Sequence, residues 1–346
     1  MANSILDSDP SKFYTYVRSL RNKNPPIETL EAGDQVFRGE DVSDGFFFAM
    51  HKLKIPSVST TNPSSNAKMI YETILSKCEN ATPIPMLSYT QTLSILKSLS
   101  PLVADIHSLT PTHFLAAGSI GVEHFKCILN MMIRNVNLAT IADINSAWAI
   151  LLHKGNGKPK NKANSWCCIS SCPLFAKAMD SYIFSLHKAQ WNAVSAPTQF
   201  MVDGSCHDLC SLLLTEMIID SVKNKKKPII ISFVDTRAAF DSSRKEHIIN
   251  EVFMANDSLP AQSILYIAKR LSSRLTYLNF NNVIMGPIHD ERGVEQGGVW
   301  SSALFQLTTN KETITLNQTN YRVNIHGESI ASLTLANDKS ICTDDK

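Results

Sequence analysis

The sequence lacks the cysteine patterns of a disulfide-stabilised or zinc-binding protein. It has eight cysteines in 346 residues, but none form the C-x-x-C pair that is typical of zinc ribbons. The tightest group is Cys206-His207-x-x-Cys210, which has a different spacing. We therefore expect reduced thiols, as in intracellular proteins, and no structural zinc.

Long hydrophobic runs and a large excess of one charge are also missing. The chain has no stretch of about 18 uncharged apolar residues, and its N-terminus has no signal-peptide core. The 33 lysines and arginines nearly balance 31 aspartates and glutamates, for a net charge of +2. This balance does not demand a polyanionic partner, although local lysine clusters can still meet one. We expect a protein that is neither secreted nor membrane-bound and that lies in the cytoplasm or nucleus.

What the chain does have is the composition of a globular protein. Hydrophobic residues make up 44% and charged residues 18%, and this length can bury the core of one large or two modest domains. Residues 1–65 are polar and interrupted by prolines, which predicts a linker-like segment with one short helix around residues 11–21. Residues 66–140 follow the 3.6-residue period of packing helices. From residue 141 strands and helices alternate.

The local patterns predict individual elements. Helices are expected at residues 69–75, 93–99, 112–134 (interrupted at Gly118 and Gly121), 175–188, 206–221, 243–255 and 260–273, and from residue 298. Strands are expected at residues 147–154, 165–170, 229–235, 321–325 and 330–336, and a hairpin over 274–288 that turns near Asn281-Asn282. Helices followed by strands that alternate with helices predict an α+β fold with an antiparallel-containing sheet.

Two of the predicted strands end on acidic residues. The run K-P-I-I-I-S-F-V-D closes on Asp235, and S-L-T-L-A-N-D closes on Asn337-Asp338. An unpaired buried carboxylate costs several kcal/mol, so Asp235 either lies at a solvated strand end or holds something positive. If the two strand ends lie side by side, their carboxylates suit magnesium, which prefers oxygen ligands. Two such ions roughly 4 Å apart can stabilise the attacking and leaving oxygens of phosphoryl transfer.

A glycine-rich segment lies between the two acids. In G-V-E-Q-G-G-V-W-S-S, which starts at Gly293, the glycines allow a backbone to pass close to a substrate before a helix begins. The chain thus contains, in order, D-x4-F-D at Asp235–Asp241, then G-V-x-Q-G-G-x-x-S-S, then L-A-N-D.

This order of motifs resembles the palm of reverse transcriptases, and within them the non-LTR (LINE-type) retrotransposon family. Upstream, L-H-K-G-N-G-K-P-K and S-W-C-C-I-S-S-C-P-L-F-A-K resemble the fingers of that family, and A-P-T-Q-F-M-V-D-G-S-C-H-D-L-C its next segment. The chain has Glu-Gln before the glycines, and in this it resembles one branch of the family, in which Glu-Gln replaces the commoner Arg-Gln. The similarity covers about 140–346 with specific motifs and about 1–140 more loosely.

The resemblance implies a right-hand polymerase fold, with fingers and palm at 141–346. It also implies an RNA-directed DNA polymerase that adds deoxynucleoside triphosphates to a DNA primer on an RNA template, with two Mg²⁺ (or Mn²⁺) ions. Its site residues would fall into two groups. The metal and catalytic positions would be Asp235, Asn337 and Asp338. The nucleotide-binding positions would be Thr236 (through its carbonyl), Phe240 (rejecting a 2′-hydroxyl), Gln296, Gly297, Gly298, Lys158 and Cys167.

The chain departs from the family pattern at two of these positions. Asn337 replaces the first acid of the metal-binding pair, and the loss of that charge would lower the rate by roughly 10²–10⁴. Cys167 stands where the family usually has an arginine, and a thiol cannot make the forked contacts of a guanidinium with phosphate. We also expect Asp241 to cap the following helix rather than to bind metal. The thumb and the upstream endonuclease of the family are expected to be absent.

Three functions therefore remain open from the sequence. The first is a reverse transcriptase of weak or no activity. The second is a degenerate, non-catalytic remnant that at most binds nucleic acid. The third is an unrelated metal-dependent phosphohydrolase, which would need a further carboxylate or histidine cluster that the sequence does not offer.

Overall fold

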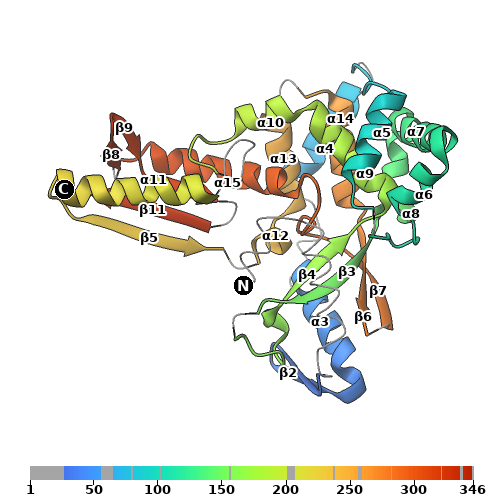
Figure 1. The fold of residues 1–346 in the computed structure, drawn as a ribbon, viewed down its shortest axis with the longest axis horizontal. Helices are drawn as coiled ribbons and strands as arrows, with labels where there is room; N and C mark the ends of the chain where they lie inside the picture. Colours follow the sequence, from blue (N-terminus) through green and yellow to red (C-terminus); the bar gives the residue numbers. More distant parts are fainter. Residues whose placement is uncertain are drawn as a thin grey trace.

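The computed structural model describes residues 27–55, 65–78, 81–101, 103–155, 157–200, 207–236, 238–255, 259–281, 283–320, 322–335 and 338–344. The structure mixes helices with antiparallel-containing sheets, so the predicted α+β class is confirmed. Figure 1 shows a helical body at one end of the molecule, a strand-rich arm at the other, and a second sheet projecting between them. Among the described residues, no helix has the length and apolar character needed to cross a bilayer.

The helical body contains most of the predicted helices and one large hydrophobic core. Leu96, Phe125 and Met179 are fully buried in it, on helices whose apolar residues recur three or four positions apart. Its helices are α4 (Ser65–Cys78), α5 (Tyr89–Ser98), α6 (Pro111–Ala116), α7 (Gly118–Arg134), α8 (Ala142–Asn145), α9 (Leu174–Leu186), α10 (Lys188–Val194), α13 (Lys245–Ala255) and α14 (Ala261–Ser272). The predicted helix over 112–134 is interrupted before Gly118, as expected, whereas Gly121 lies inside α7.

A four-stranded sheet projects from the helical body, in the order β4-β3-β6-β7. Its strands are β3 (Ser146–His153), β4 (Trp166–Ser171), β6 (Leu275–Phe280) and β7 (Val283–His289). β3 pairs antiparallel with β4 and parallel with β6, and β6 and β7 form the predicted hairpin. β3 therefore joins the hairpin to the strand that carries Cys167.

The segment that was expected to be linker-like is ordered structure over residues 27–55, and the prediction is wrong there. Strands β1 (Thr29–Ala32) and β2 (Gln35–Arg38) form a hairpin, and helix α3 (Val42–Lys54) follows it. Phe46 and Met50, one helical turn apart, pack with Leu278 into a separate core beneath the four-stranded sheet. The helix expected at 11–21 lies outside the described residues. The division of the chain into residues 1–65, 66–140 and 141–346 stays a prediction.

The strand-rich arm is built on a three-stranded antiparallel sheet in the order β10-β11-β5. Its strands are β5 (Ile229–Asp235), β10 (Ser332–Leu335) and β11 (Asp338–Asp344). Met217 of α11 (His207–Ile219) packs on one face beside Cys342, while Lys339 pairs with Glu312 of α15 (Ser301–Asn317) on the other. A small hairpin, β8 (Val323–Ile325) and β9 (Glu328–Ile330), completes the same core. The sequence predicted β5 and β10 but missed β11, which lies between them.

Candidate active site

The ends of β5 and β11 place two carboxylates next to each other. Asp235 is the last residue of β5, Asp338 is the first of β11, and the two are direct cross-strand partners in the antiparallel register. Such partners have Cβ atoms about 4.5–5.5 Å apart. Both residues are exposed, and Thr236, which follows Asp235, is exposed too. The structure therefore brings together the two acids that the sequence singled out 103 positions apart (338 − 235).

The electrostatics of this pair suit a cation. Desolvation and, after it, the negative charge of Asp235 raise the pKa of the Asp338 carboxyl. Asp235 and Asp338 would hold a divalent ion that prefers oxygen ligands, and its positive charge would offset the repulsion between the two carboxylates. Within the described ranges no group of three or more His, Cys, Asp or Glu side chains is arranged for metal binding. Asn337 lies outside the described residues.

Phe240 follows Asp235, the end of β5, by five residues. Ala238 adopts a left-handed conformation (φ 51°, ψ 38°) directly before α12 (Ala239–Ser242), which is unusual for a residue with a Cβ and is often found at functional sites. The Phe240 ring stacks on Phe305 of α15, with centroids 5.0 Å apart and planes 27° apart. The ring is partly buried, so its position is fixed by packing. Its role as a sugar gate stays a prediction.

The glycine-rich loop lies against α12 and β4. The N–H of Gly293 donates to the carbonyl of Ser243 (2.7 Å), and the N–H of Val294 donates to the carbonyl of Phe240 (2.8 Å). On the other side, the N–H of Ser170 donates to the carbonyl of Gln296 (3.0 Å). The loop therefore holds the Q-G-G residues between the strand that carries Cys167 and the helix that carries Phe240. Here the loop approaches the chain's own backbone, while the close approach of the glycines to a substrate stays a prediction.

Gly293 is the position where this packing demands glycine. Its φ is +87°, and a Cβ there would lie 2.8 Å from the carbonyl oxygen of Asp241. We expect Gly293→Ala to lower the free energy of unfolding by about 1–3 kcal/mol, through strain and a backbone clash. Gly297→Ala is the matched control, because Gly297 also has a positive φ (+93°) but its Cβ would meet nothing nearer than 3.5 Å. Urea unfolding checks this, and equal losses in both variants would contradict the role assigned to the clash.

The surroundings of Cys167 combine positive and negative side chains. Burial raises the pKa of the Cys167 thiol, while Lys154 and Lys158 lower it and Asp241 raises it. These groups are therefore within electrostatic range of one another. At neutral pH the thiol is therefore uncharged, and the positive charge near it comes from Lys154 and Lys158.

Asp241 does not play the helix-capping role that we predicted. It lies inside α12, is 6% exposed, and pairs with the ammonium of Lys54 (Oδ1 to Nζ, 3.0 Å). Its other oxygen accepts a hydrogen bond from Nε2 of Gln296 (3.0 Å). Sequence reasoning missed Lys54 because it lies in the segment taken for a linker. The apolar period of F-F-F-A-M-H-K-L-K, residues 46–54, was the signal that could have revealed its helix.

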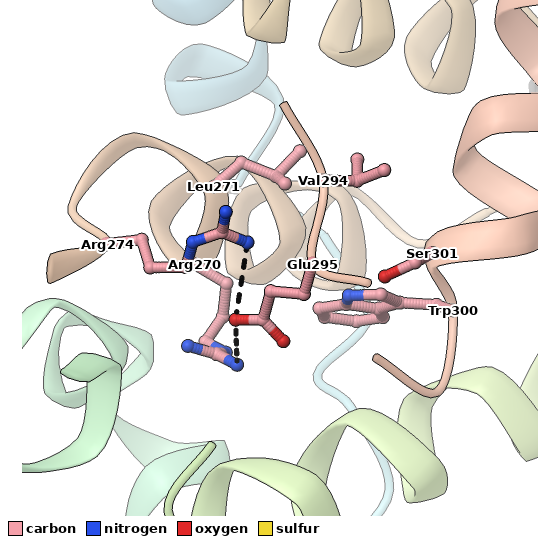
Figure 2. A pocket seen from close by; sticks show the side chains of 7 residues that line it. All are labelled: Arg270, Leu271, Arg274, Val294, Glu295, Trp300 and Ser301. Atoms are coloured by element: carbon pink, nitrogen blue, oxygen red, sulfur yellow. Dashed lines mark ion pairs between the residues drawn. The ribbon is translucent and has the colours of Figure 1, made fainter. Parts of the chain in front are cut away.

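A buried ionic network underlies the loop, and sequence reasoning missed it too. Figure 2 shows the Glu295 carboxylate between the guanidinium groups of Arg270 and Arg274, at 3.5 and 3.4 Å. Burial would raise the pKa of Glu295, but the two arginines outweigh it and hold the pKa below its usual value. Arg270 also pairs with Asp180 (2.9 Å), and Arg274 pairs with Asp290. Glu295 is thus charged and held in place directly before Gln296.

Part of the chain matches a known protein family. Residues 158–329 match the family model described as reverse transcriptase (RNA-dependent DNA polymerase). The matched range contains Lys158, Cys167, Asp235, Phe240 and the Q-G-G loop, and it ends before Asn337 and Asp338. The mixed helix-and-sheet fold is consistent with the fingers and palm of this family. No curated protein matches the chain.

Proposed function

We propose that this chain, which contains a reverse transcriptase domain at residues 158–329, provides the fingers and palm of an RNA-directed DNA polymerase of the non-LTR retrotransposon type. It would act inside the cell, in the cytoplasm or nucleus, on an RNA template, a DNA primer and deoxynucleoside triphosphates. The observation that carries the proposal is the register that sets Asp235 opposite Asp338. Without that pairing, the family motifs would be a sequence resemblance with no common site.

The carboxylates of Asp235 and Asp338, with the carbonyl of Thr236, would hold the divalent ions. When bound, Mg²⁺ or Mn²⁺ would activate the primer 3′-hydroxyl and neutralise charge on the triphosphate. Lys158 and its neighbour Lys154 would attract the triphosphate or the template backbone through their charge. The Q-G-G loop, which is pinned to α12 and β4, would form one wall of the nucleotide pocket.

Two positions weaken this site in the present chain. Asn337 offers an amide oxygen where the family has a carboxylate, so the ions would be balanced by one negative charge fewer. Cys167 offers a neutral thiol where the family has a guanidinium. We therefore propose that the chain is a weak polymerase, and primer extension with Mg²⁺ or Mn²⁺ tests this. Extension at the rate of a fully acidic family member would contradict the proposed weakening, and extension that survives Asp235→Asn would contradict the site.

A second function is favoured by the same two substitutions. A remnant that has lost catalysis but keeps its fold would still bind primer–template through its lysines. Such binding would weaken steeply with salt, because each phosphate contact releases a counterion. Salt-dependent binding without any extension, even after Asn337→Asp, would favour this binding role over the polymerase.

Phe240 offers a test of substrate choice. In the Asn337→Asp chain, we expect Phe240→Ala to reduce the preference for deoxynucleotides over ribonucleotides by about 10- to 200-fold, because a steric clash with the 2′-hydroxyl is removed. The ratio of kcat/KM for the two nucleotides measures this. Phe253→Ala serves as a control, since Phe253 packs on the helical core and its loss should leave the ratio unchanged. An unchanged ratio in Phe240→Ala would remove this residue from sugar selection.

A further inference from the structure

Lys54 carries a positive charge from the helix α3 into the candidate active site. It is the last residue of α3 and is 2% exposed. Its ammonium lies 3.0 Å from Oδ1 of Asp241 and 3.7 Å from Oδ2 of Asp290. Lysine is almost never fully buried unless it is paired, so these carboxylates explain why the charge is tolerated there.

The end of α3 is attached to the segment that leads into the glycine-rich loop. The side chain of Arg292 donates to the carbonyls of Lys52 (2.8 Å) and Leu53 (2.6 Å). The backbone N–H groups of Glu291 and Arg292 both donate to the carbonyl of Lys54 (3.2 and 3.3 Å). These bonds satisfy the free carbonyls at the end of the helix. They also fix Lys54 relative to residues 293–298.

Asp241 connects Lys54 to the nucleotide pocket. One carboxylate oxygen faces the ammonium of Lys54, and the other accepts the hydrogen bond from the Gln296 side chain. We infer that Lys54 is a positioning residue that holds the Asp241 carboxylate in one orientation and thereby fixes the Gln296 amide within the nucleotide pocket. The role of Gln296 in nucleotide binding rests on the proposed function. The contacts that join Lys54, Asp241 and Gln296 do not depend on it.

The contacts of Asp241 with Lys54 and Gln296 fix the orientation of the Gln296 side chain, which the neighbouring residues in the sequence do not fix. A glutamine side chain loses substantial rotamer freedom when it is held in one conformation, and only Nε2 of its amide can donate to a carboxylate. A hydrogen bond to an ionised acceptor is about twice as strong as a neutral one. A carboxylate held by Lys54 therefore selects one face of the Gln296 amide, and leaves its Oε1 directed away from Asp241.

NMR of the full chain labelled with ¹⁵N-glutamine tests the geometry without requiring catalysis. The Gln296 side-chain amide is assigned by its loss in Gln296→Ala. We expect this signal to lie apart from exposed glutamines in the wild-type chain and to move to their position in Lys54→Met. Lys52→Met is the matched control, because Lys52 lies on the same helix and covers the Phe48 ring at 4.4 Å, and it should leave the signal in place. An unmoved signal in Lys54→Met overturns the inference.

A companion variant keeps the test decisive if Lys54→Met does not fold. Lys54→Met with Asp241→Asn leaves no unpaired carboxylate at position 241 and should fold. The side-chain amide introduced at position 241 can turn either its oxygen or its NH2 group toward Gln296. The signal of the Gln296 side-chain amide should therefore again be displaced. A wild-type signal in this double variant would mean that Lys54 only balances charge.

Kinetics in the Asn337→Asp chain extend the test to function. We expect Lys54→Met to raise the KM for the deoxynucleotide about tenfold with a smaller effect on kcat, and to have no further effect on KM when Gln296→Ala is already present. Additive effects of the two changes would overturn the link through Asp241. If the Asn337→Asp chain extends no primer at all, the proposed function fails, while the NMR result still decides the role of Lys54.

Discussion

Changing Asn337 to aspartate is expected to raise the rate of primer extension by about 10²–10⁴-fold, the largest gain that a single substitution offers. The substitution adds a full negative charge to the chain directly before Asp338, the residue that pairs with Asp235 in the β11–β5 register. The added carboxylate would help Asp235 and Asp338 to hold the divalent ions, whose positive charge would stabilise the negative charge that develops on the triphosphate in the transition state. Steady-state extension of a labelled primer on an RNA template, at saturating Mg²⁺, measures the gain.

Two further variants show whether the gain comes from metal binding. Asn337→Ala should leave the already low rate nearly unchanged, because it adds no charge. Asn337→Asp combined with Asp235→Asn should lose the gain, because the opposing carboxylate is then missing. Adding Cys167→Arg to Asn337→Asp should lower the KM for the nucleotide further, through forked contacts with its phosphates. A gain that persists without Asp235 would contradict the two-carboxylate site.

Arg274→Met is expected to cost the fold about 3–5 kcal/mol in the free energy of unfolding. Arg274 is 2% exposed and pairs with two buried carboxylates, those of Asp290 and Glu295. Removing it leaves both acids with weaker partners in a poorly solvated region. The loss is this large because buried charges remain without a full partner. An intact buried ion pair, by contrast, makes only a small net contribution to the free energy of unfolding.

Urea unfolding checks this prediction, with an ion pair on the protein surface as the comparison. Lys126→Met breaks the ion pair with Glu123 on the surface of α7, and such pairs contribute about 0–1 kcal/mol. Adding Glu295→Gln to Arg274→Met should restore part of the loss, because one orphaned charge is removed. Glu295→Arg, which installs the commoner residue of the family resemblance, should be strongly destabilising here, since it faces Arg270 and Arg274. A loss below about 1 kcal/mol in Arg274→Met would contradict the network.

The sequence predicted those parts of the site that depend on local patterns. The continuous apolar run before Asp235 predicted β5, and the short apolar segment before Asn337 predicted β10. Their neighbour β11 has the mixed sequence D-K-S-I-C-T-D, which has little strand character of its own. It is a strand because it pairs with β5, whose residues lie about a hundred positions earlier, and single-sequence periodicity cannot show such pairing.

The parts that could not be predicted are those in which distant residues meet. Lys54 lies between prolines at positions 26 and 56, and its segment was taken for a linker because turn-forming residues flank it. Glu295 was noticed only as a replacement for arginine. Its two arginine partners, one on α14 and one just after it, are nine-tenths or more buried, which composition gives no reason to expect.

Direct measurement of metal binding is the most decisive test of the account. Mn²⁺ bound to the full chain can be titrated by electron paramagnetic resonance, with Asp235→Asn, Asp338→Asn and Asn337→Asp beside the wild type. We expect weak binding in the wild-type chain, none in Asp235→Asn or Asp338→Asn, and tighter binding in Asn337→Asp. Equal Mn²⁺ binding in all four proteins would contradict the claim that these strand ends form the metal site of a polymerase palm.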